Sequence, residues 1–533
     1  MEDFDLAILD AEVLDGSGSQ SYTSNIGVKD GVISRITNDR ISASVEISAK
    51  NLCACPGFID VHSHSDMVPF CDSETKSKVS GERVLQGITT EVVGNCGYSA
   101  APHNSNKAAL FKEYYQIVSH FEVKISWESF EEYVKRASEY GTMTNLAPLV
   151  GHGNIRLAVM GMDSRAATQS ERGSMAELLR DCLASGAYGL STGLLYTPGS
   201  FADSLELQAL CGAVSSEGGI LTSHLRNYSS HLQESIAEMI SLAKGASIPL
   251  QISHNMATGQ AQWGSASMTL STLDNARKLG VDVTFDQYPY TAGMTYLGAV
   301  LPPWMHEGGK QMLRSRLRSE EERNKAKRHM REGLGSWESI SRDIGWENIV
   351  IGYSKDNPSL IGRSLKSISS GKDPADVAMD IIANESEPTM IIIHMMSEDD
   401  VITLMRSNLQ MFGTDGIATP GTTHPRTLSS YPRIFRRYVI EKGILSWEEA
   451  VKKCTHLPAL RFSIEDRGLL REGFAADIVL FDKKEIRDVG TYEDPMLHPK
   501  GIKHVFVNGQ AVVENGEKKD KLPGMVLRRS KHQ

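Results

Sequence analysis

The feature that most constrains the fold of this chain is a regular alternation of short apolar segments with stretches of helical spacing. Most gaps between the apolar segments are one helix long, and the helical stretches 174–186 and 274–280 end on Gly, a common stop signal. The predicted strands are 56–61, 89–95, 145–151, 186–192, 219–224, 249–254, 281–288 and 410–415. Alternation of this kind favours a parallel α/β fold, and eight strands predict a (β/α)₈ TIM barrel.

Two segments disturb this alternation. Residues 389–396, which read TMIIIHMM, are a ninth strand candidate, so the sequence leaves the strand count open between eight and nine. The charged stretch 306–348 follows the seventh strand and breaks the pattern. We interpret it as part of a helical insertion over residues 296–348, with both boundaries approximate.

Both ends of the chain are rich in short β-strand patterns joined by Gly and Asp turns, and Asn508–Gly509 is a hairpin signal. A chain of 533 residues is too long for one compact core and is expected to form two or three domains. We therefore predict that residues 1–55 and 460–533 form one small β-sandwich domain. Residues 56–459 would then form the barrel.

The composition limits which classes of binding partner and which cellular compartment fit this chain. The net charge is −10 and no run of Lys or Arg forms a basic stripe, which argues against nucleic acid as a partner. The acidic start does not read as a signal peptide, and no apolar run reaches the ~18 residues of a membrane span. The seven cysteines are few and irregularly spaced, which is typical of free thiols in a reducing compartment. We expect a cytoplasmic protein that acts on a small molecule.

Metal chemistry is first indicated at the end of the first predicted strand. His62 and His64 are two residues apart, and such residues face the same side of a strand. In a barrel both side chains would lie at the mouth formed by the carboxyl ends of the strands, where catalytic residues lie. Two imidazoles there can bind one divalent metal, but this pattern alone is weak.

Further polar residues recur at the same level of the predicted barrel. Cys96, His224, His254 and Asp415 end the second, fifth, sixth and eighth strands. Each has a simpler explanation when taken alone: a buried Cys, a core His, or an Asp that caps the next helix. Their recurrence at successive strand ends nevertheless predicts a metal site at the barrel mouth.

Several longer motifs carry a family resemblance that covers nearly the whole chain. They are PGFIDVHSHSD, EVVGNCGYSAAP, GHGNIR (151–156), GAYGLSTGLLYTPG (186–199), FDQYPYTAG (285–293), and TDG followed by THPR (423–426). With these motifs the chain resembles the amidohydrolase superfamily. Most of its two-metal hydrolases use a carboxylated Lys as the bridging ligand. The D-aminoacylase family of N-acyl-D-amino-acid deacylases uses a Cys, as this chain does at Cys96.

The resemblance implies zinc-dependent hydrolysis of N-acyl-D-amino acids by a metal-activated water. The implied ligands are Cys96, His224 and His254 in a tight site, and His62, His64 and Asp415 beside Cys96 in a second, weaker site. Asp415 would accept the proton of the attacking water and pass it to the leaving amine. Whether one or two metals are bound stays open at this stage.

The resemblance also implies a substrate site. Arg426 would bind the substrate carboxylate with help from Tyr288, because a planar guanidinium suits bidentate pairing. Met294 stands where the family commonly has a Ser that assists, and Thr295 could substitute for it. This departure leaves the preferred amino acid open.

Two further residues are weaker candidates for the substrate site. His152 ends the third strand, where a supporting role is as plausible as a catalytic one, and Tyr196 would line the pocket or simply pack in a loop. Rival functions are a cyclic amidase of the hydantoinase or dihydroorotase type, a barrel that has lost catalysis and serves as a scaffold, and another amidohydrolase such as an isoaspartyl peptidase or a deaminase. Cys96 and THPR argue against the cyclic amidase, and the oligomeric state stays open.

Overall fold

Eight parallel strands form a barrel at the centre of the protein. The structure is a computed structural model that describes residues 4–417, 419 and 424–530. The ring consists of β6 (Phe58–Asp60), β8 (Ile88–Val93), β9 (Asn145–Pro148) continued by β10 (Val150–Gly151), β11 (Gly189–Gly193), β12 (Ile220–His224), β13 (Leu250–Ile252), β14 (Val283–Gln287) and β18 (Gln410–Phe412). All neighbouring pairs are parallel.

Two short strands close the ring between the last and the first position. They are β7 (Ser63–His64) and β19 (Gly416–Ile417), which pair in parallel with Gly416 opposite Ser63. Helices follow the strands, among them α1 (Ser73–Val84), α5 (Gln169–Ala184), α6 (Ser204–Glu217), α7 (Leu232–Ala246), α8 (Ala266–Lys278) and α14 (Glu398–Met405). Every residue of β8 is buried, as expected of a parallel strand that has a filled interior on one side and helices on the other. The predicted (β/α)₈ barrel is confirmed.

The ninth strand candidate lies outside the ring. Strand β17 (Met390–His394) pairs antiparallel with β15 (Ala292–Tyr296) and β16 (Ile349–Tyr353) in a separate three-stranded sheet. Its apolar run resembles that of a barrel strand because the central strand of a small covered sheet is also buried on both faces. The barrel therefore has eight strands.

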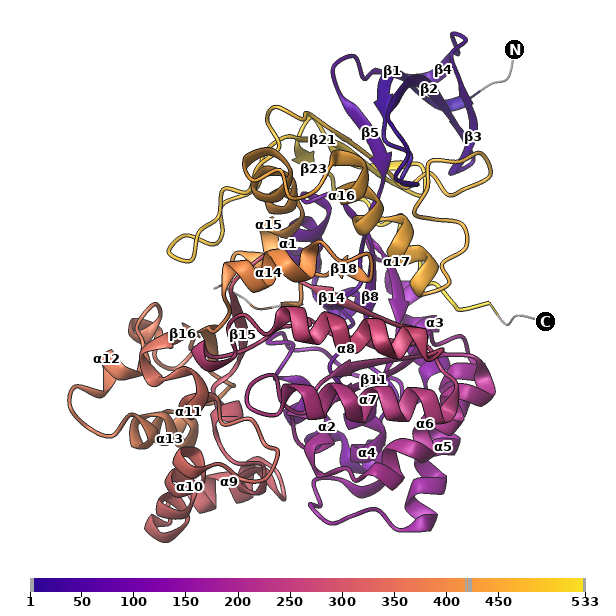
Figure 1. Cartoon of the computed structure of the whole chain (residues 1–533). Coiled ribbons are helices and arrows are strands. Elements are labelled where there is room, and N and C mark those ends of the chain that lie inside the picture. Colours follow the sequence, from indigo (N-terminus) through magenta and orange to yellow (C-terminus); the bar gives the residue numbers. More distant parts are fainter. Residues whose placement is uncertain (1–3, 418, 420–423, 531–533) are drawn as a thin grey trace.

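The expected insertion follows the seventh strand and packs beside the barrel (Figure 1). Its helices are α9 (Lys310–Leu317), α10 (Glu320–Glu332), α11 (Ile340–Ile344), α12 (Leu365–Ser369) and α13 (Pro374–Asn384). It continues past residue 348 and also contains the sheet of β15, β16 and β17. The boundary at 348 falls short because the sequence from 349 onward returns to apolar strand patterns that resemble the barrel.

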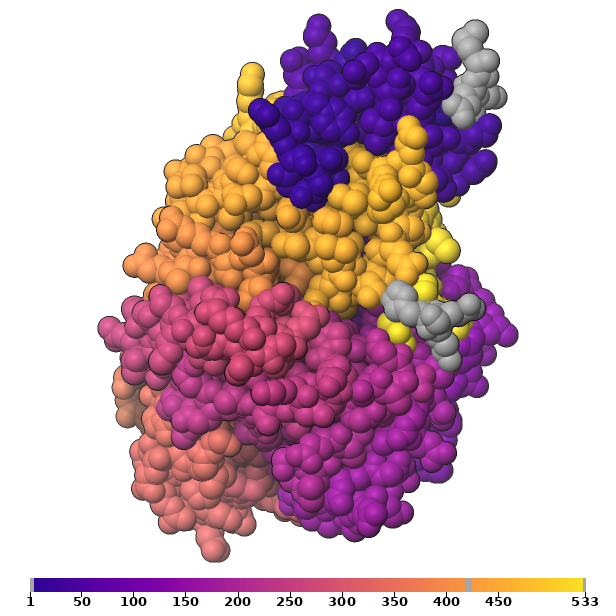
Figure 2. Space-filling view, turned by 45° about the vertical axis from the view of Figure 1, so that its right-hand side comes forward, coloured from indigo at the N-terminus to yellow at the C-terminus, as the bar shows by residue number. Residues whose placement is uncertain are grey.

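A small β domain contains strands from both ends of the chain, as predicted from their composition. It includes β1 (Phe4–Val13), β2 (Tyr22–Lys29), β3 (Val32–Thr37), β4 (Ala43–Ser48), β5 (Cys53–Pro56), β20 (Ile478–Phe481), β21 (Ile502–Val507), β22 (Gln510–Glu514) and β23 (Glu517–Lys518). Strand β5 joins the two halves, because it pairs with both β1 and β20. The sheet curls back on itself, so that Ile33 N in β3 donates a hydrogen bond to Phe474 O in the segment before β20. Figure 2 shows the N-terminal strands against the C-terminal segment.

The exact domain boundaries, 1–55 with 460–533 and 56–459, stay a prediction. In the described part of the chain, no helix combines the length and the apolar character that a membrane span requires. All seven cysteines are buried free thiols.

Candidate metal centre and substrate cavity

The candidate metal ligands all lie at the carboxyl ends of the barrel strands. His62 follows β6, His64 ends β7, Cys96 follows β8, His224 ends β12, His254 follows β13, and Asp415 lies between β18 and β19. All six are buried. The fold therefore brings together six residues that are scattered over the sequence, and it does so because parallel strands in a barrel end at one face.

Three of these residues have an unusual backbone conformation. The φ angles of Cys96, His254 and Asp415 are 54°, 32° and 49°, in the left-handed region that residues other than Gly rarely adopt. Hydrogen bonds hold two of them: Asp415 N donates to His62 O over 2.8 Å, and His254 N donates to the carboxylate of Asp286 over 2.7 Å. Such strain is typical of functional sites, where a side chain must be aimed in a direction that a regular strand does not allow.

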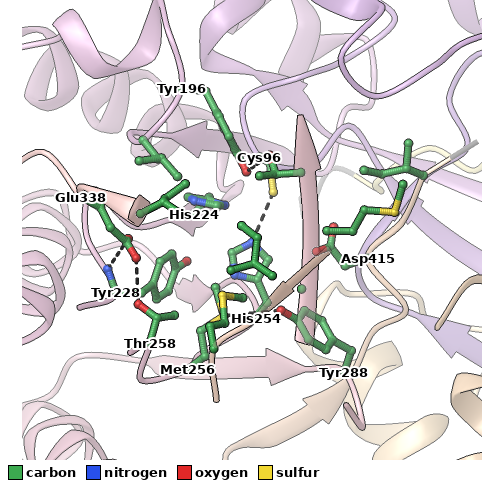
Figure 3. Close-up of a pocket in the computed structure, with 18 of the residues that line it drawn as sticks. Cys96, Tyr196, His224, Tyr228, His254, Met256, Thr258, Tyr288, Glu338 and Asp415 are labelled. Atoms are coloured by element: carbon green, nitrogen blue, oxygen red, sulfur yellow. Dashed lines mark hydrogen bonds between the residues drawn. The ribbon is translucent and has the colours of Figure 1, made fainter. Parts of the chain in front are cut away.

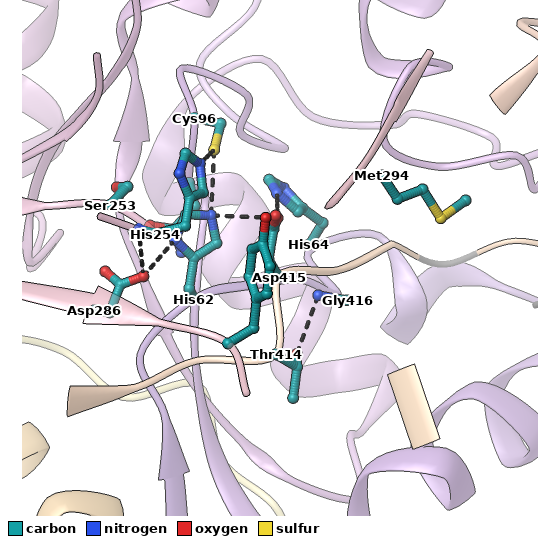
Figure 4. Close-up of polar contacts among 12 residues, drawn as sticks. His62, His64, Cys96, Ser253, His254, Asp286, Met294, Thr414, Asp415 and Gly416 are labelled. Carbon is teal, nitrogen blue, oxygen red and sulfur yellow. Dashed lines mark hydrogen bonds and ion pairs between the residues drawn. The ribbon is translucent and has the colours of Figure 1, made fainter. Parts of the chain in front are cut away.

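The ligand atoms form two groups that share Cys96. His62, His64, Cys96 and Asp415 form one group, and Cys96, His224 and His254 form the other, with all ligand atoms within 4.8 Å of one another in each. Cys96 Sγ lies 3.2 Å from His62 Nε2 and 3.6 Å from His254 Nε2 (Figure 4). These are the same two groups that the family resemblance implies.

The protonation and hydrogen bonding of these residues suit a metal ion. Both ring nitrogens of His224 are buried and have no hydrogen-bond partner among the described residues, which calls for a partner such as an ion. Burial lowers the pKa of His224 well below its ordinary value and that of His254 to about 4, so both imidazoles are neutral and can offer a lone pair. Thiolate and imidazole together are typical zinc ligands.

The carboxylate of Asp415 is kept ionised by its neighbours. Burial opposes its ionisation, but the charges of Arg426 and His62 and the hydrogen bond with His64 hold the pKa of Asp415 well below its usual range. Arg426 Nη1 lies 2.9 Å from Asp415 Oδ2. The guanidinium also stacks over the ring of Tyr288, with 4.8 Å between its carbon and the ring centre. In this structure Arg426 therefore pairs with the proposed base.

A cavity opens beside the metal ligands, as is usual for small-molecule sites, which are concave and largely lined by apolar side chains. His64, Cys96, His224, His254 and Asp415 line one end of it, as Figure 3 shows in part. The predicted residues Tyr196 and Tyr288 line its walls, together with Met294 and Thr295. Tyr196 Oη lies 3.1 Å from Thr295 Oγ1. Thr423, in the THPR motif, lies outside the described residues.

Comparison with known proteins agrees with this geometry. The sequence model of a protein family, described as "Amidohydrolase family", matches residues 45–324 and 383–513 of this chain. The chain belongs to the amidohydrolase family. It is 30% identical to a D-aminoacylase and 31% identical to an N-acyl-D-glutamate deacylase, both of Alcaligenes xylosoxydans xylosoxydans, over 99% of this chain and 98% and 97% of those proteins.

A solved amidohydrolase structure resembles the whole chain. The N-acyl-D-glutamate deacylase of Bordetella bronchiseptica, in complex with zinc and a phosphonate inhibitor that mimics the tetrahedral intermediate, superimposes with a TM-score of 0.80. It is 31% identical, and the alignment covers 99% of this chain and 100% of that protein. The resemblance to D-aminoacylases stated from the motifs is confirmed.

Of the four predicted substrate residues of this amidohydrolase, Tyr196 and Tyr288 line the cavity, whereas Arg426 and His152 are not among the described residues that line it. His152 Nε2 lies 2.7 Å from Glu206 Oε1, and Glu206 also pairs with Arg156. The strand ends at Gly151, and His152 begins α4 (His152–Met160), which turns its side chain toward α6. In this structure His152 therefore belongs to a buried polar network between two helices, and its assignment to the substrate site stays a prediction.

Sequence reasoning missed the carboxylates behind the ligands of this amidohydrolase. Asp286 Oδ1 accepts the hydrogen bond of His254 N and lies 3.3 Å from His62 Nδ1. Asp60 accepts hydrogen bonds from His62 N over 3.1 Å and from Thr414 N over 2.9 Å. Carboxylates that orient the ligands of a metal are a common feature of metal sites. The signal was present in FIDV and TFDQY, where an acid interrupts a buried apolar strand.

Proposed function

We propose that this amidohydrolase is a zinc-dependent N-acyl-D-amino-acid deacylase, which hydrolyses the amide bond to a carboxylate and a free D-amino acid. The observation that carries the proposal is the presence of Cys96 in both ligand groups, one of which contains Asp415, and the pairing of Asp415 with Arg426. The names of its relatives support the same reaction class. The cyclic amidase is the weaker alternative, because the residue shared by the two groups is a Cys and not a Lys.

We place one tight zinc site at Cys96, His224 and His254. A second, weaker site would consist of His62, His64 and Asp415 beside Cys96. Zinc, when bound, supplies a Lewis acid that polarises the amide carbonyl and lowers the pKa of the attacking water. Cys96 acts as a ligand in this proposal and not as a nucleophile.

The other steps belong to side chains of this protein. The ionised carboxylate of Asp415 accepts the proton of the attacking water and then delivers it to the leaving amine. Arg426, held against the ring of Tyr288, binds the carboxylate of the substrate. Because Arg426 also pairs with Asp415, one guanidinium links the position of the substrate to the position of the base.

A direct assay tests the proposed function. Zinc-loaded protein is incubated with paired N-acetyl-D- and N-acetyl-L-amino acids, and the release of free amine is measured. We expect release from D-amino acid derivatives and its loss after zinc is removed with a chelator. Amine release from none of the D-derivatives, or turnover of cyclic amides alone, would contradict the proposal.

Replacement of Arg426 tests how the substrate is bound. Arg426→Lys keeps the charge but loses the planar pair of donors, so we expect kcat/KM on N-acetyl-D-amino acids to fall about ten- to a hundredfold, with Arg426→Ala worse. The matched measurement uses an acyl amine that lacks the carboxylate. A smaller loss on that compound supports direct recognition of the carboxylate, whereas an equal loss would mean that Arg426 acts through Asp415.

Replacement of Asp286 tests the support of the ligands. Asp286→Asn removes the charge that faces His62 and His254, so we expect zinc affinity to fall about 10- to 100-fold in competition with a chelator. The control is Asp282→Asn, on the same segment, where the side chain is 58% exposed and pairs with Arg277. Equal zinc affinity in the two variants would show that Asp286 only supports the backbone.

The buried free thiols also favour a reducing compartment as the place where the protein works. We propose that the protein works in the reducing cytoplasm, because seven unpaired cysteines are typical of proteins kept reduced. Its partner in this proposal is a small N-acyl amino acid.

A further inference from the structure

The insertion supplies the side of the cavity that lies away from the metal ligands. Ile340 and Ile344 on α11 line this side, together with Ile393 and Met395 at the end of β17. The barrel loops add Met256 to the same lining. A substituent of the substrate that points away from the metal therefore meets an apolar wall that the insertion builds.

Two acids lie at opposite sides of this cavity. Asp415 lies at the metal end, and Glu338, which comes just before α11, lies across from it (Figure 3). Neither Lys nor Arg occurs among the described residues that line the cavity. Residues 418 and 420–423 lie outside the described part of the chain, but their sequence is Ala, Pro, Gly, Thr and Thr, which adds no positive charge.

Glu338 is held in place by uncharged donors, and burial raises the pKa of its carboxyl to about 7, so the carboxylate carries its full charge above that pH. Its side chain accepts hydrogen bonds from Tyr228 N and from Thr258 Oγ1, both over 2.8 Å, and the residue is 4% exposed. The ring of Tyr228 packs against both His224 and His254, with ring centres 5.1 and 5.3 Å apart. Glu338 is therefore fixed relative to the metal ligands.

We propose that the insertion selects N-acyl-D-amino acids with uncharged, apolar side chains and that Glu338 is the residue that rejects acidic ones. The proposal rests on the proposed deacylase function. In the proposed function Arg426, which pairs with Asp415 and is not itself among the lining residues, serves one carboxylate of the substrate. A second carboxylate on the side chain would lose its hydration between an apolar wall and Glu338, with no cation to pair with. The relatives include a D-aminoacylase and an N-acyl-D-glutamate deacylase, so the family alone does not decide this choice.

The first experiment compares substrates of similar size on the zinc-loaded protein. We expect kcat/KM on N-acetyl-D-leucine and N-acetyl-D-methionine to exceed that on N-acetyl-D-glutamate and N-acetyl-D-aspartate by at least about 100-fold. A kcat/KM on the acidic derivatives that lies within tenfold of that on the apolar derivatives, or above it, would overturn the selectivity. It would leave the deacylase function intact. If none of the four derivatives is hydrolysed, the deacylase function itself fails, and the selectivity fails with it.

The second experiment isolates the charge of Glu338. Above about pH 8, where Glu338 is ionised, Glu338→Gln should lower the ratio of kcat/KM on N-acetyl-D-leucine to kcat/KM on N-acetyl-D-glutamate about tenfold, because it removes the negative charge and keeps the shape. The matched control is Glu385→Gln, which neutralises another buried carboxyl that accepts a hydrogen bond from Thr389 N and lies away from this cavity. The control should leave the preference unchanged. An equal effect of the two variants, or no effect of Glu338→Gln, would remove Glu338 from selectivity.

A third experiment tests the same proposal if Glu338→Gln does not fold, because it looks for a gain of activity on acidic substrates. Met256→Lys places a cation on the wall by exchanging one long, flexible side chain for another, and Met256→Leu is its control. The measured quantity is the ratio of kcat/KM on N-acetyl-D-glutamate to kcat/KM on N-acetyl-D-leucine. We expect this ratio to be about tenfold higher in Met256→Lys than in Met256→Leu. The same ratio in both variants would show that charge on this wall does not set the preference.

Discussion

Cys96→Ala is expected to lose the tightly bound zinc and at least about 10³-fold of kcat, because it removes the thiolate that both ligand groups share. Cys96 Sγ is the atom that lies between His62 Nε2 and His254 Nε2. Without it, the tight site retains two imidazoles and no charge to balance the ion. The zinc content of the purified protein, measured after dialysis against a weak chelator, is the primary readout, and kcat is the second.

Cys211→Ala is the matched control for this prediction. Cys211 is a buried free thiol on α6 and contributes to the apolar core away from the ligand groups. Both variants delete one buried sulfur, so both lose packing, but only Cys96→Ala should lose zinc. Full zinc occupancy in Cys96→Ala would make Cys96 a packing residue and refute the ligand assignment.

The second large effect is expected at Asp415. Asp415→Asn should lower kcat about 10²- to 10⁴-fold, which is the usual contribution of a positioned acid–base group. The amide cannot take up the proton of the attacking water. The zinc held by Cys96, His224 and His254 should remain, because Asp415 belongs to the other group. Measurement of kcat and zinc content on the same preparation separates proton transfer from metal binding.

The control for Asp415→Asn must also break a buried ion pair. Asp488→Asn does so, because Asp488 is buried and lies 3.1 Å from Arg433 Nη1, away from the cavity. We expect both variants to unfold at lower temperature and only Asp415→Asn to lose kcat. A near wild-type kcat in Asp415→Asn would exclude this carboxylate as the base.

The strand pattern was readable from the sequence because it depends on neighbours along the chain. All eight predicted barrel strands are present, and the ligand residues stand at their carboxyl ends. The segment 389–396 shows the limit of such a pattern. It has the apolar composition of a barrel strand, but its partners are β15 and β16, and the choice of partner is made by packing and not by composition.

The supporting residues were harder to predict for a related reason. Asp286 and Glu338 have no motif of their own, and their importance follows from contacts with residues far away in the sequence. His152 shows the reverse case: a strand-end position suggested the substrate site, but the helix begins at this residue and turns its side chain toward Glu206.

By itself the sequence determined the barrel, the β-rich ends and the candidate metal ligands, because local hydrophobic patterns and strand ends are encoded by adjacent residues. Only the tertiary structure decided that Cys96 belongs to two ligand groups, that Arg426 pairs with Asp415, and that Glu338 faces the cavity. Each of these depends on contacts between segments remote in sequence. Such contacts form only when the barrel closes and the insertion packs against it, so no local pattern specifies them.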